Sequence, residues 1–230
     1  MIHFSDEIIF KRDKELCPYE KALEKMQATV LDIQQGTGCQ TLWFTEHPPL
    51  YTAGTSARPD DLINPQNYPT YKAGRGGQWT YHGPGQRIVY LMLDLSRPHG
   101  LIAPRDIRSY VQGLENWLIS ALNLLNIDAF TREGRVGVWC IDSLTRQESK
   151  IAAIGIRISR WVSWHGIALN VMPELTDFEG IIPCGIREYG VTSLARFDPA
   201  CSMTKTDSAL LTSWSRIFGT ELSEVNGPER

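Results

Sequence analysis

The 230-residue chain has 23 basic and 26 acidic residues, a formal net charge of −3, and 42% hydrophobic residues. This balance excludes a dedicated nucleic-acid binder, which is usually basic, and a disordered chain, which lacks apolar residues. No apolar stretch approaches the roughly 20 residues that span a bilayer, and no basic segment followed by an apolar run opens the chain, so we expect a cytoplasmic protein without membrane contact.

The N-terminal half predicts a short leading strand and then a helix over residues 19–35, which the glycines of residues 36–38 end. A strand follows around residues 41–44. Prolines and Asp or Asn residues then accumulate over residues 54–69, which predicts a long irregular connection too polar for the core. Residues 87–95 (RIVYLMLDL) are typical of a buried strand that follows a glycine-rich turn.

In the C-terminal half, apolar residues recur every three or four positions over residues 104–125, which predicts a long amphipathic helix covering a sheet. Three strands are predicted next, the last two as an antiparallel hairpin: residues 136–141, 151–161 and 164–171. The polar run 142–149 is interpreted as a surface loop, residues 210–218 as a closing helix, and the tail after Leu222 as frayed. The fold class is α/β (α+β): one domain over residues 1–230, with a mixed or mainly antiparallel sheet flanked by helices.

The segment GRGGQWTYHGPGQ, residues 74–86, has five glycines in thirteen residues. Glycine loses more backbone freedom on folding than any other residue, so we expect a ligand or another segment to approach this backbone closely. An ordinary wide turn is the alternative. Arg75 and His82 favour a ligand-binding loop, although the segment matches neither the phosphate P-loop nor the GxGxxG dinucleotide pattern.

Two later strand segments have further candidate residues. Lys150 precedes the apolar run IAAIG, and taken alone it is an ordinary surface lysine. In WHGIALNV, the small residues Gly166 and Ala168 alternate with larger ones, so on a strand they face one side and leave room for an apolar ligand. His165 is equally compatible with a structural, hydrogen-bonded histidine.

The five cysteines are an odd number without CxxC spacing, which suits neither a disulfide framework nor a zinc site. Cys184 lies between Pro183 and Gly185, on a turn where a thiol can be approached. The other four are interpreted as small core residues: Cys17, Cys39, Cys140 and Cys201. The histidines show no HExxH spacing, and no metal site is expected.

The motifs occur in the order RGGQWTYHGPGQ, KIAAIGIR, WHGIALNV and IIPCGI with VTSL. With this combination, the chain resembles the lipoyl(octanoyl) transferases over residues 48–196. The resemblance implies a fold like that of the biotin and lipoate protein ligases. It also implies transfer of an octanoyl group from octanoyl-acyl-carrier-protein to a lysine ε-amine, without a cofactor. The implied acceptors are the lipoyl domains of 2-oxoacid dehydrogenase complexes and the H protein of glycine cleavage.

The resemblance implies that Cys184 carries the acyl group as a thioester, that Lys150 is its partner, and that His82 orients or assists the reacting groups. The thiolate is the reactive form of cysteine, and a nearby ammonium lowers the thiol pKa. The implied acyl pocket comprises Arg75, Gly76, Gly77, Gln78, Trp79, Thr80, Tyr81, His82, Ala153, Ile154, Gly155, Gly166, Ile167 and Ala168. Three backbone N–H groups are candidate oxyanion donors: those of Gly76, Gly77 and Gly185.

Both implied protein partners are acidic, so we expect a basic rim of Arg75, Arg157 and Arg160 around the pocket to steer them. One alternative is a lipoate or biotin protein ligase, which activates its acid with ATP and needs no nucleophilic cysteine. Another is a non-catalytic acyl-binding relative, which forms no covalent intermediate.

Overall fold

The computed structural model describes residues 7–182 and 190–224. Its longer helices are α1 (Tyr19–Gln35), α2 (Ile107–Leu124) and α3 (Met203–Phe218). Short 3-10 helices are η1 (Pro59–Asp61), η2 (Leu175–Gly180) and η4 (Leu194–Arg196). The strands are β1 (Ile8–Arg12), β2 (Gln40–Thr45), β3 (Leu50–Ala53), β4 (Thr70–Lys72), β5 (Trp79–His82), β6 (Gln86–Met92), β7 (Ala129–Arg132), β8 (Arg135–Ile141), β9 (Glu148–Ser159), β10 (Val162–Asn170), β11 (Gly190–Val191) and β12 (Leu222–Glu224).

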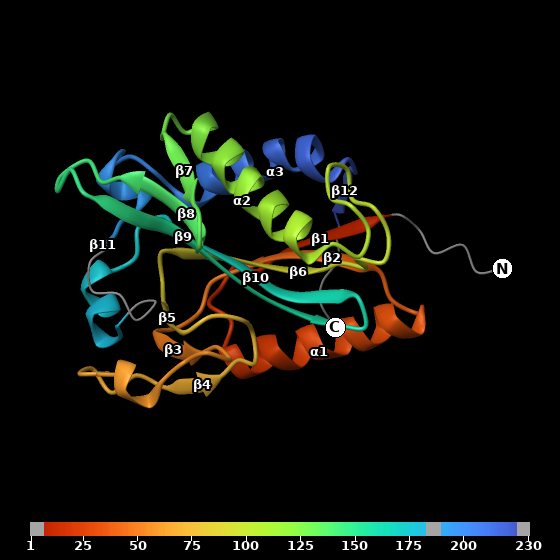
Figure 1. Ribbon diagram of the computed structural model, residues 1–230, viewed down its shortest axis with the longest axis horizontal. Helices are drawn as coiled ribbons and strands as arrows, with labels where there is room; N and C mark the ends of the chain where they lie inside the picture. The colour runs from red at the N-terminus through yellow and green to blue at the C-terminus, as the bar shows by residue number, and fades with distance from the viewer. Residues whose placement is uncertain (1–6, 183–189, 225–230) are drawn as a thin grey trace.

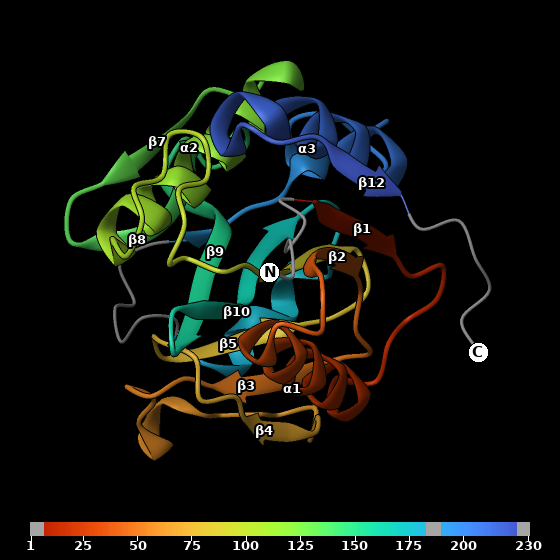
Figure 2. The ribbon, with the colours of Figure 1, turned by 90° about the vertical axis from the view of Figure 1, so that its right-hand side faces the viewer.

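A nine-stranded sheet, counted over the described residues, has the order β12-β1-β2-β6-β10-β9-β8-β7, and β11 pairs with β9 beside that path. Neighbouring strands are antiparallel except for three parallel pairs: β1 with β12, β1 with β2, and β11 with β9. Figures 1 and 2 show α2 and α3 on one face of this sheet and α1 on the other. The predicted mixed, mainly antiparallel sheet flanked by helices is therefore confirmed.

Each face of the sheet has its own apolar core. Leu114, Trp117 and Leu118 of α2 are fully buried between the sheet and α3, and the Trp117 ring meets that of Trp214 edge-on at 5.3 Å. Its indole N–H donates to the carbonyl of Leu210 over 2.8 Å. On the opposite face, α1 packs the buried side chains of Ala22, Met26 and Val30, which are spaced four residues apart. Both cores hold the central strands from the two sides.

A second, three-stranded sheet with the order β4-β3-β5 extends the α1 side of the molecule (Figure 1). It is tied to η2 by hydroxyl groups that converge on Asp177. Tyr51 donates to the Asp177 carbonyl, and Tyr81 donates to its carboxylate, both over 2.6 Å. Tyr68 donates to the second carboxylate oxygen over 3.2 Å. The small sheet thereby fixes η2, the element that leads to Ile181 and Ile182.

Most of the predicted elements are present. The leading strand is β1, and the helix predicted over 19–35 is α1, ended by Gly36 in the left-handed conformation at φ 76°. The hairpin of β9 and β10 turns through Arg160 and Trp161, at φ 47° and 65°. Positive φ at both central positions is the geometry of a tight type I′ turn, which suits two twisted antiparallel strands.

Two local predictions were wrong. The glycine-rich segment is not turn throughout, because β5 lies within it and pairs with β3, with Tyr51 opposite Tyr81. The polar run 142–149 is not loop throughout, because Glu148 and Ser149 pair with Ile141 and Cys140 of β8. Polar residues are accommodated there since the Glu148 carboxylate accepts from Arg132 and Arg135, over 2.8 and 3.3 Å.

Two further expectations need correction. The tail does not fray directly after Leu222, because β12 pairs in parallel with β1, with Leu222 opposite Ile8. Residues 225–230 lie outside the described part of the chain. Among the cysteines predicted as core, Cys17 and Cys140 are buried, whereas Cys39 is exposed and Cys201 is half-buried.

Candidate functional site

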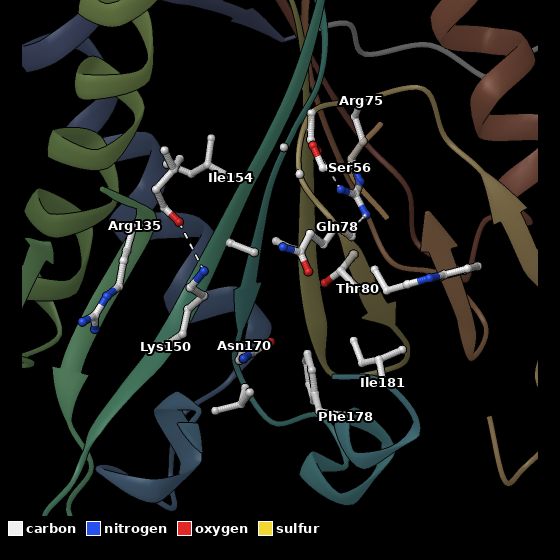
Figure 3. A pocket seen from close by; sticks show the side chains of 18 of the residues that line it. Ser56, Arg75, Gln78, Thr80, Arg135, Lys150, Ile154, Asn170, Phe178 and Ile181 are labelled. Atoms are coloured by element: carbon white, nitrogen blue, oxygen red, sulfur yellow. Dashed lines mark hydrogen bonds between the residues drawn. The ribbon is translucent and has the colours of Figure 1, made fainter. Parts of the chain in front are cut away.

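A cavity of about 490 Å³ lies between β9 and the segment that leads into β5. Figure 3 shows Lys150 entering it from β9, with Gln78 and Thr80 on the opposite side. Phe178 of η2 and Ile181, which follows it, close one end. The site is thus an apolar space with a few convergent polar groups, as is typical of small-molecule pockets.

Most of the residues predicted for an acyl pocket line this cavity: Arg75, Gly76, Gly77, Gln78, Trp79, Thr80, Ala153, Ile154, Gly155 and Ala168. Four predicted residues do not line it. Tyr81 is buried against η2, while His82, Gly166 and Ile167 border a smaller cavity of about 50 Å³. A Cβ atom on Gly166 would lie 2.1 Å from the Val89 carbonyl oxygen, so this glycine serves the close approach of β10 to β6.

Lys150 reaches the cavity because β9 contains an irregularity. Val138 of β8 pairs with Ala152, but Trp139 pairs with Lys150, which leaves Ile151 as an extra residue on β9. Ile151 and Ala152 are consequently both buried in the core. The shift resets the alternation of the strand and places Lys150 on the cavity side. The sequence context of Lys150 indicates a position at the end of a strand. Lys150 is instead the third residue of β9.

The Lys150 side chain crosses to the neighbouring strand. Its Nζ donates to the backbone carbonyl of Val136 over 3.2 Å and lies 4.7 Å from the centre of the Trp139 ring. The dashed line in Figure 3 marks the first of these contacts. An ammonium over an indole face gains electrostatic attraction. The group is thus held beside the cavity by one carbonyl and one ring of β8.

Arg75 forms part of the cavity wall from a buried position. Its Nη2 donates to the Thr52 carbonyl and hydroxyl, both over 2.9 Å, and to the Gln78 carbonyl over 3.1 Å. Its Nη1 donates to the Gly76 carbonyl over 2.8 Å. A Cβ on Gly155 would lie 2.8 Å from Cδ of Arg75, so glycine at position 155 makes room for this side chain. The glycine-rich segment therefore wraps around the guanidinium, which its carbonyl groups contact.

The predicted basic rim is therefore wrong for Arg75, which is 8% exposed. Arg157 and Arg160 are exposed, but neither lines the large cavity. Arg157 lies over the Trp164 ring at 5.0 Å, and Arg160 donates to Gln34 at the end of α1 over 2.5 Å. Besides the buried Arg75, Arg135 lines the cavity.

Of the oxyanion candidates, Gly76 already donates its N–H to the carbonyl of Ile156 over 2.9 Å. That amide is engaged in holding the loop to β9. Gly77 lines the cavity with φ 85°, a conformation that favours glycine, and it stays a candidate. Gly185 lies outside the described residues.

A buried chain of hydrogen bonds links His82 to the backbone of β9. His82 Nδ1 donates to Gln86 Oε1 over 2.7 Å, and Gln86 Nε2 donates to Asn170 Oδ1 over 2.9 Å. Asn170 Nδ2 then donates to the Thr192 carbonyl over 2.9 Å, and the Thr192 N–H donates to the Lys150 carbonyl over 3.0 Å. Burial, and then the nearby His47, lower the His82 pKa to about 3, which keeps the ring neutral.

His165 is buried, and its Nε2 donates to the carbonyl of Ala73 over 3.0 Å. This contact ties β10 to the start of the glycine-rich segment. The structural interpretation of His165 accounts for its position.

Cys184 lies outside the described residues, but the residues on both sides of residues 183–189 are described. On one side, Ile181 pairs with Leu62 and lines the cavity. On the other, Gly190 and Val191 line the cavity, with Val191 paired to Lys150. Described residues on both sides of residues 183–189 therefore line the cavity.

Several cavity residues were missed by sequence reasoning. Gln86 and Asn170 lie within motifs already singled out, RGGQWTYHGPGQ and WHGIALNV, and their motif position was the available signal. Ile181 opens the motif IIPCGI, whereas Trp139 and Phe178 are apolar residues in ordinary contexts. Only the tertiary fold brings the three to the cavity.

The model of the lipoyl protein ligase A/B catalytic domain matches residues 18–215, which include all the segments that line the cavity. The chain belongs to this family. Within it, the octanoyltransferase of Acidiphilium cryptum is 56% identical, over 88% of this chain and 89% of the relative. Those of Gluconacetobacter diazotrophicus and Maricaulis maris are both 52% identical, over 92% and 93% of this chain and 91% and 92% of their own lengths.

Among solved structures of the family, a lipoate-protein ligase A bound with ATP superposes with a TM-score of 0.75 at 14% identity, over 95% of this chain and 87% of that chain. A bipartite lipoate protein ligase from Thermoplasma acidophilum gives 0.73 at 17% identity, over 95% and 86%. At these identities the likeness shows the fold alone, and it confirms the expected ligase-like fold. The resemblance to the lipoyl(octanoyl) transferases is confirmed by the relatives, and the protein is an acyltransferase.

Within residues 7–182 and 190–224, no helix has the length and apolar character needed to cross a bilayer. The same residues hold no group of three or more His, Cys, Asp or Glu side chains suited to a metal ion.

Proposed function

We propose that the protein transfers an octanoyl group from octanoyl-acyl-carrier-protein to the ε-amine of a lysine on a lipoyl domain, through a thioester on Cys184. Octanoyl transfer in protein lipoylation is supported by relatives that are 50–56% identical over about nine-tenths of the chain. The cysteine route is supported by one observation above all: Ile181 and Gly190, which lie on either side of the segment that carries Cys184, line the cavity that Lys150 enters. Cys184 follows Ile181 by three residues, a span of at most about 11 Å.

The cavity supplies the acyl-binding space of this proposal. Its walls combine apolar side chains such as Ile154, Phe178 and Ile181 with the small residues Ala153 and Ala168. Burying each methylene contributes about 0.8 kcal/mol, so the seven carbons beyond the octanoyl carbonyl contribute roughly 6 kcal/mol. This energy holds the thioester while the carrier protein leaves and the lipoyl domain arrives.

In the first half-reaction, the Cys184 thiolate attacks the carbonyl carbon of the donor thioester. The tetrahedral oxyanion collapses, the bond to the carrier sulfur breaks, and an octanoyl-cysteine thioester forms. The Lys150 ammonium stabilises the attacking thiolate and gives its proton to the departing carrier thiolate. The Gly77 N–H is a candidate donor to the oxyanion.

In the second half-reaction, the uncharged ε-amine of the lipoyl-domain lysine attacks the octanoyl-cysteine carbonyl. An amide forms as the bond to the Cys184 sulfur breaks. Lys150, now neutral, accepts the proton that the attacking amine loses, which restores the ammonium and thiolate pair. In this proposal His82 acts from behind the cavity, through Gln86, and not on the reacting atoms.

The acceptors in this proposal are the lipoyl domains of 2-oxoacid dehydrogenase complexes and the glycine-cleavage H protein, and the reaction takes place in the cytoplasm. No cofactor takes part. The reaction therefore requires neither ATP nor a free fatty acid.

Intact-protein mass spectrometry after mixing with octanoyl-acyl-carrier-protein tests the covalent route. The wild type and a Cys39→Ala control, which removes an exposed thiol, are expected to gain one octanoyl group without ATP. Cys184→Ala is expected to gain none and to lose transfer to a lipoyl domain. Transfer that persists in Cys184→Ala refutes the thioester, and loading of free octanoate that depends on ATP refutes the carrier-protein donor.

A further inference from the structure

The strand opposite Lys150 has a backbone conformation that only glycine adopts readily. Gly137 of β8 has φ 122°. A Cβ there would lie 2.8 Å from the Ala152 carbonyl oxygen and 3.4 Å from Cε of Lys150. Glycine at this position therefore lets β8 pass close beside the lysine side chain, next to the register shift of β9.

The peptide unit between Val136 and Gly137 is held at both ends. Its carbonyl oxygen accepts from Lys150 Nζ over 3.2 Å, and its N–H donates to Glu115 Oε1 over 3.1 Å. A trans peptide is a rigid plane in which the N–H and C=O point in opposite directions. Whatever fixes the direction of the N–H thereby fixes the direction of the carbonyl that accepts from Lys150.

Glu115 is well placed to fix this plane. It belongs to α2, on a turn anchored by the fully buried Leu114 and Leu118. Glu115 does not line the cavity, whereas Val111, one turn earlier in α2, does. Hydrogen bonds that run through one peptide between charged groups polarise and strengthen one another.

We propose that Glu115 is a positioning residue for Lys150, acting through the single peptide unit between Val136 and Gly137. The proposal rests on the proposed role of Lys150 in proton transfer. Glu115 touches no substrate atom. It aims the carbonyl that holds the lysine ammonium beside the cavity, so removing the carboxylate releases the peptide plane and lets the ammonium settle elsewhere.

Turnover is the first readout. Glu115→Ala is expected to lower kcat about tenfold, equivalent to about 1.4 kcal/mol, while the KM for octanoyl-acyl-carrier-protein stays unchanged. Glu115→Gln keeps an oxygen acceptor for the Gly137 N–H and is expected to stay within about threefold of the wild type. Asn116→Ala, an exposed neighbour on the same helix, is the matched control and is expected to change nothing.

A double-mutant cycle separates positioning from a general structural effect. The rate of iodoacetamide alkylation of Cys184, measured by mass spectrometry of its peptide, is compared for wild type, Glu115→Ala, Lys150→Ala and the double variant. We expect each single variant to slow alkylation and the double variant to equal Lys150→Ala, because Glu115 acts only through the lysine. This readout remains measurable where turnover is lost.

The outcomes distinguish this inference from the proposed function. Additive effects, an unchanged Glu115→Ala variant, or a Glu115→Gln variant as slow as Glu115→Ala would overturn the positioning role. If Lys150→Ala itself transfers octanoyl groups and reacts with iodoacetamide at the wild-type rate, the proposed function of Lys150 fails and the inference fails with it.

Discussion

Three of the four histidines buried in the described part of the chain, His47, His82 and His165, make the folded protein sensitive to mild acid. Burial is the main cause that lowers the pKa of His47 to about 4, and those of His82 and His165 to about 3. Their hydrogen bonds suit the neutral ring: His47 Nδ1 donates to the Cys17 carbonyl and its Nε2 accepts from the Tyr90 hydroxyl, both over 2.6 Å. Protonation of His47 would place a second N–H on Nε2, the atom that accepts from the Tyr90 hydroxyl.

The sign follows from the protons bound in each state. In the unfolded chain the three rings have pKa values near 6.5, so between about pH 6.5 and 4 the unfolded chain takes up protons that the folded protein does not. Stability is therefore fully present above pH 7 and falls as the solution is acidified. From pH 7 to pH 5.5 each ring contributes a loss of roughly 1.2 kcal/mol, or about 4 kcal/mol for the three.

Urea unfolding, followed by tryptophan fluorescence at both pH values, measures this loss. Carboxylates have reference pKa values near 4, so they contribute little above pH 5.5. His47→Gln is the matched variant and is expected to reduce the pH dependence by about one third. An unfolding free energy that is equal at pH 7 and pH 5.5 would refute the assignment of three neutral buried rings.

Three substitutions test other parts of the structure. Arg87→Met should lower the unfolding free energy by about 3–5 kcal/mol, because it removes the 2.7 Å ion pair to the buried Asp207, and a second change, Asp207→Leu, should recover most of the loss in urea titrations. Asn170→Ala should cost about 2–4 kcal/mol, since it leaves the Thr192 carbonyl without this side-chain donor, and hydrogen exchange should then rise in β11 more than in α1. Ala168→Leu adds bulk to the cavity wall and should shift the preferred acyl chain to one about two or three carbons shorter, which competition between carrier proteins loaded with different chains would measure.

Sequence periodicity predicted the elements whose environment is simple. Helices α1 and α2 each present one apolar stripe to one face of the sheet, and such a stripe is visible as a period of three to four residues. The β9 and β10 hairpin was likewise visible as two apolar runs with a short break. The lateral order of the strands could not be predicted, because β2, β6 and β10 are neighbours in the sheet but far apart in the chain.

The sequence named residues that line the cavity but not how they lie around it. KIAAIG gives no sign of the shift that turns Lys150 towards the cavity, since the shift depends on how β8 pairs with β9. Arginine is usually a surface residue, yet the guanidinium of Arg75 is surrounded by backbone carbonyl groups. These belong to Thr52, Gly76 and Gln78. Backbone partners of this kind are set by tertiary contact and leave no trace in residue spacing.

Three polar motif residues hold neighbouring parts of the protein in place. Arg75, His82 and Gln86 all come from the glycine-rich segment, and all three direct hydrogen bonds to neighbouring protein groups. A cavity with mainly apolar walls has few polar groups of its own to fix its shape, so its rigidity must come from behind its walls. The buried chain from His82 to the carbonyl of Lys150 supplies such support, because it ends on the same strand residue whose side chain enters the cavity.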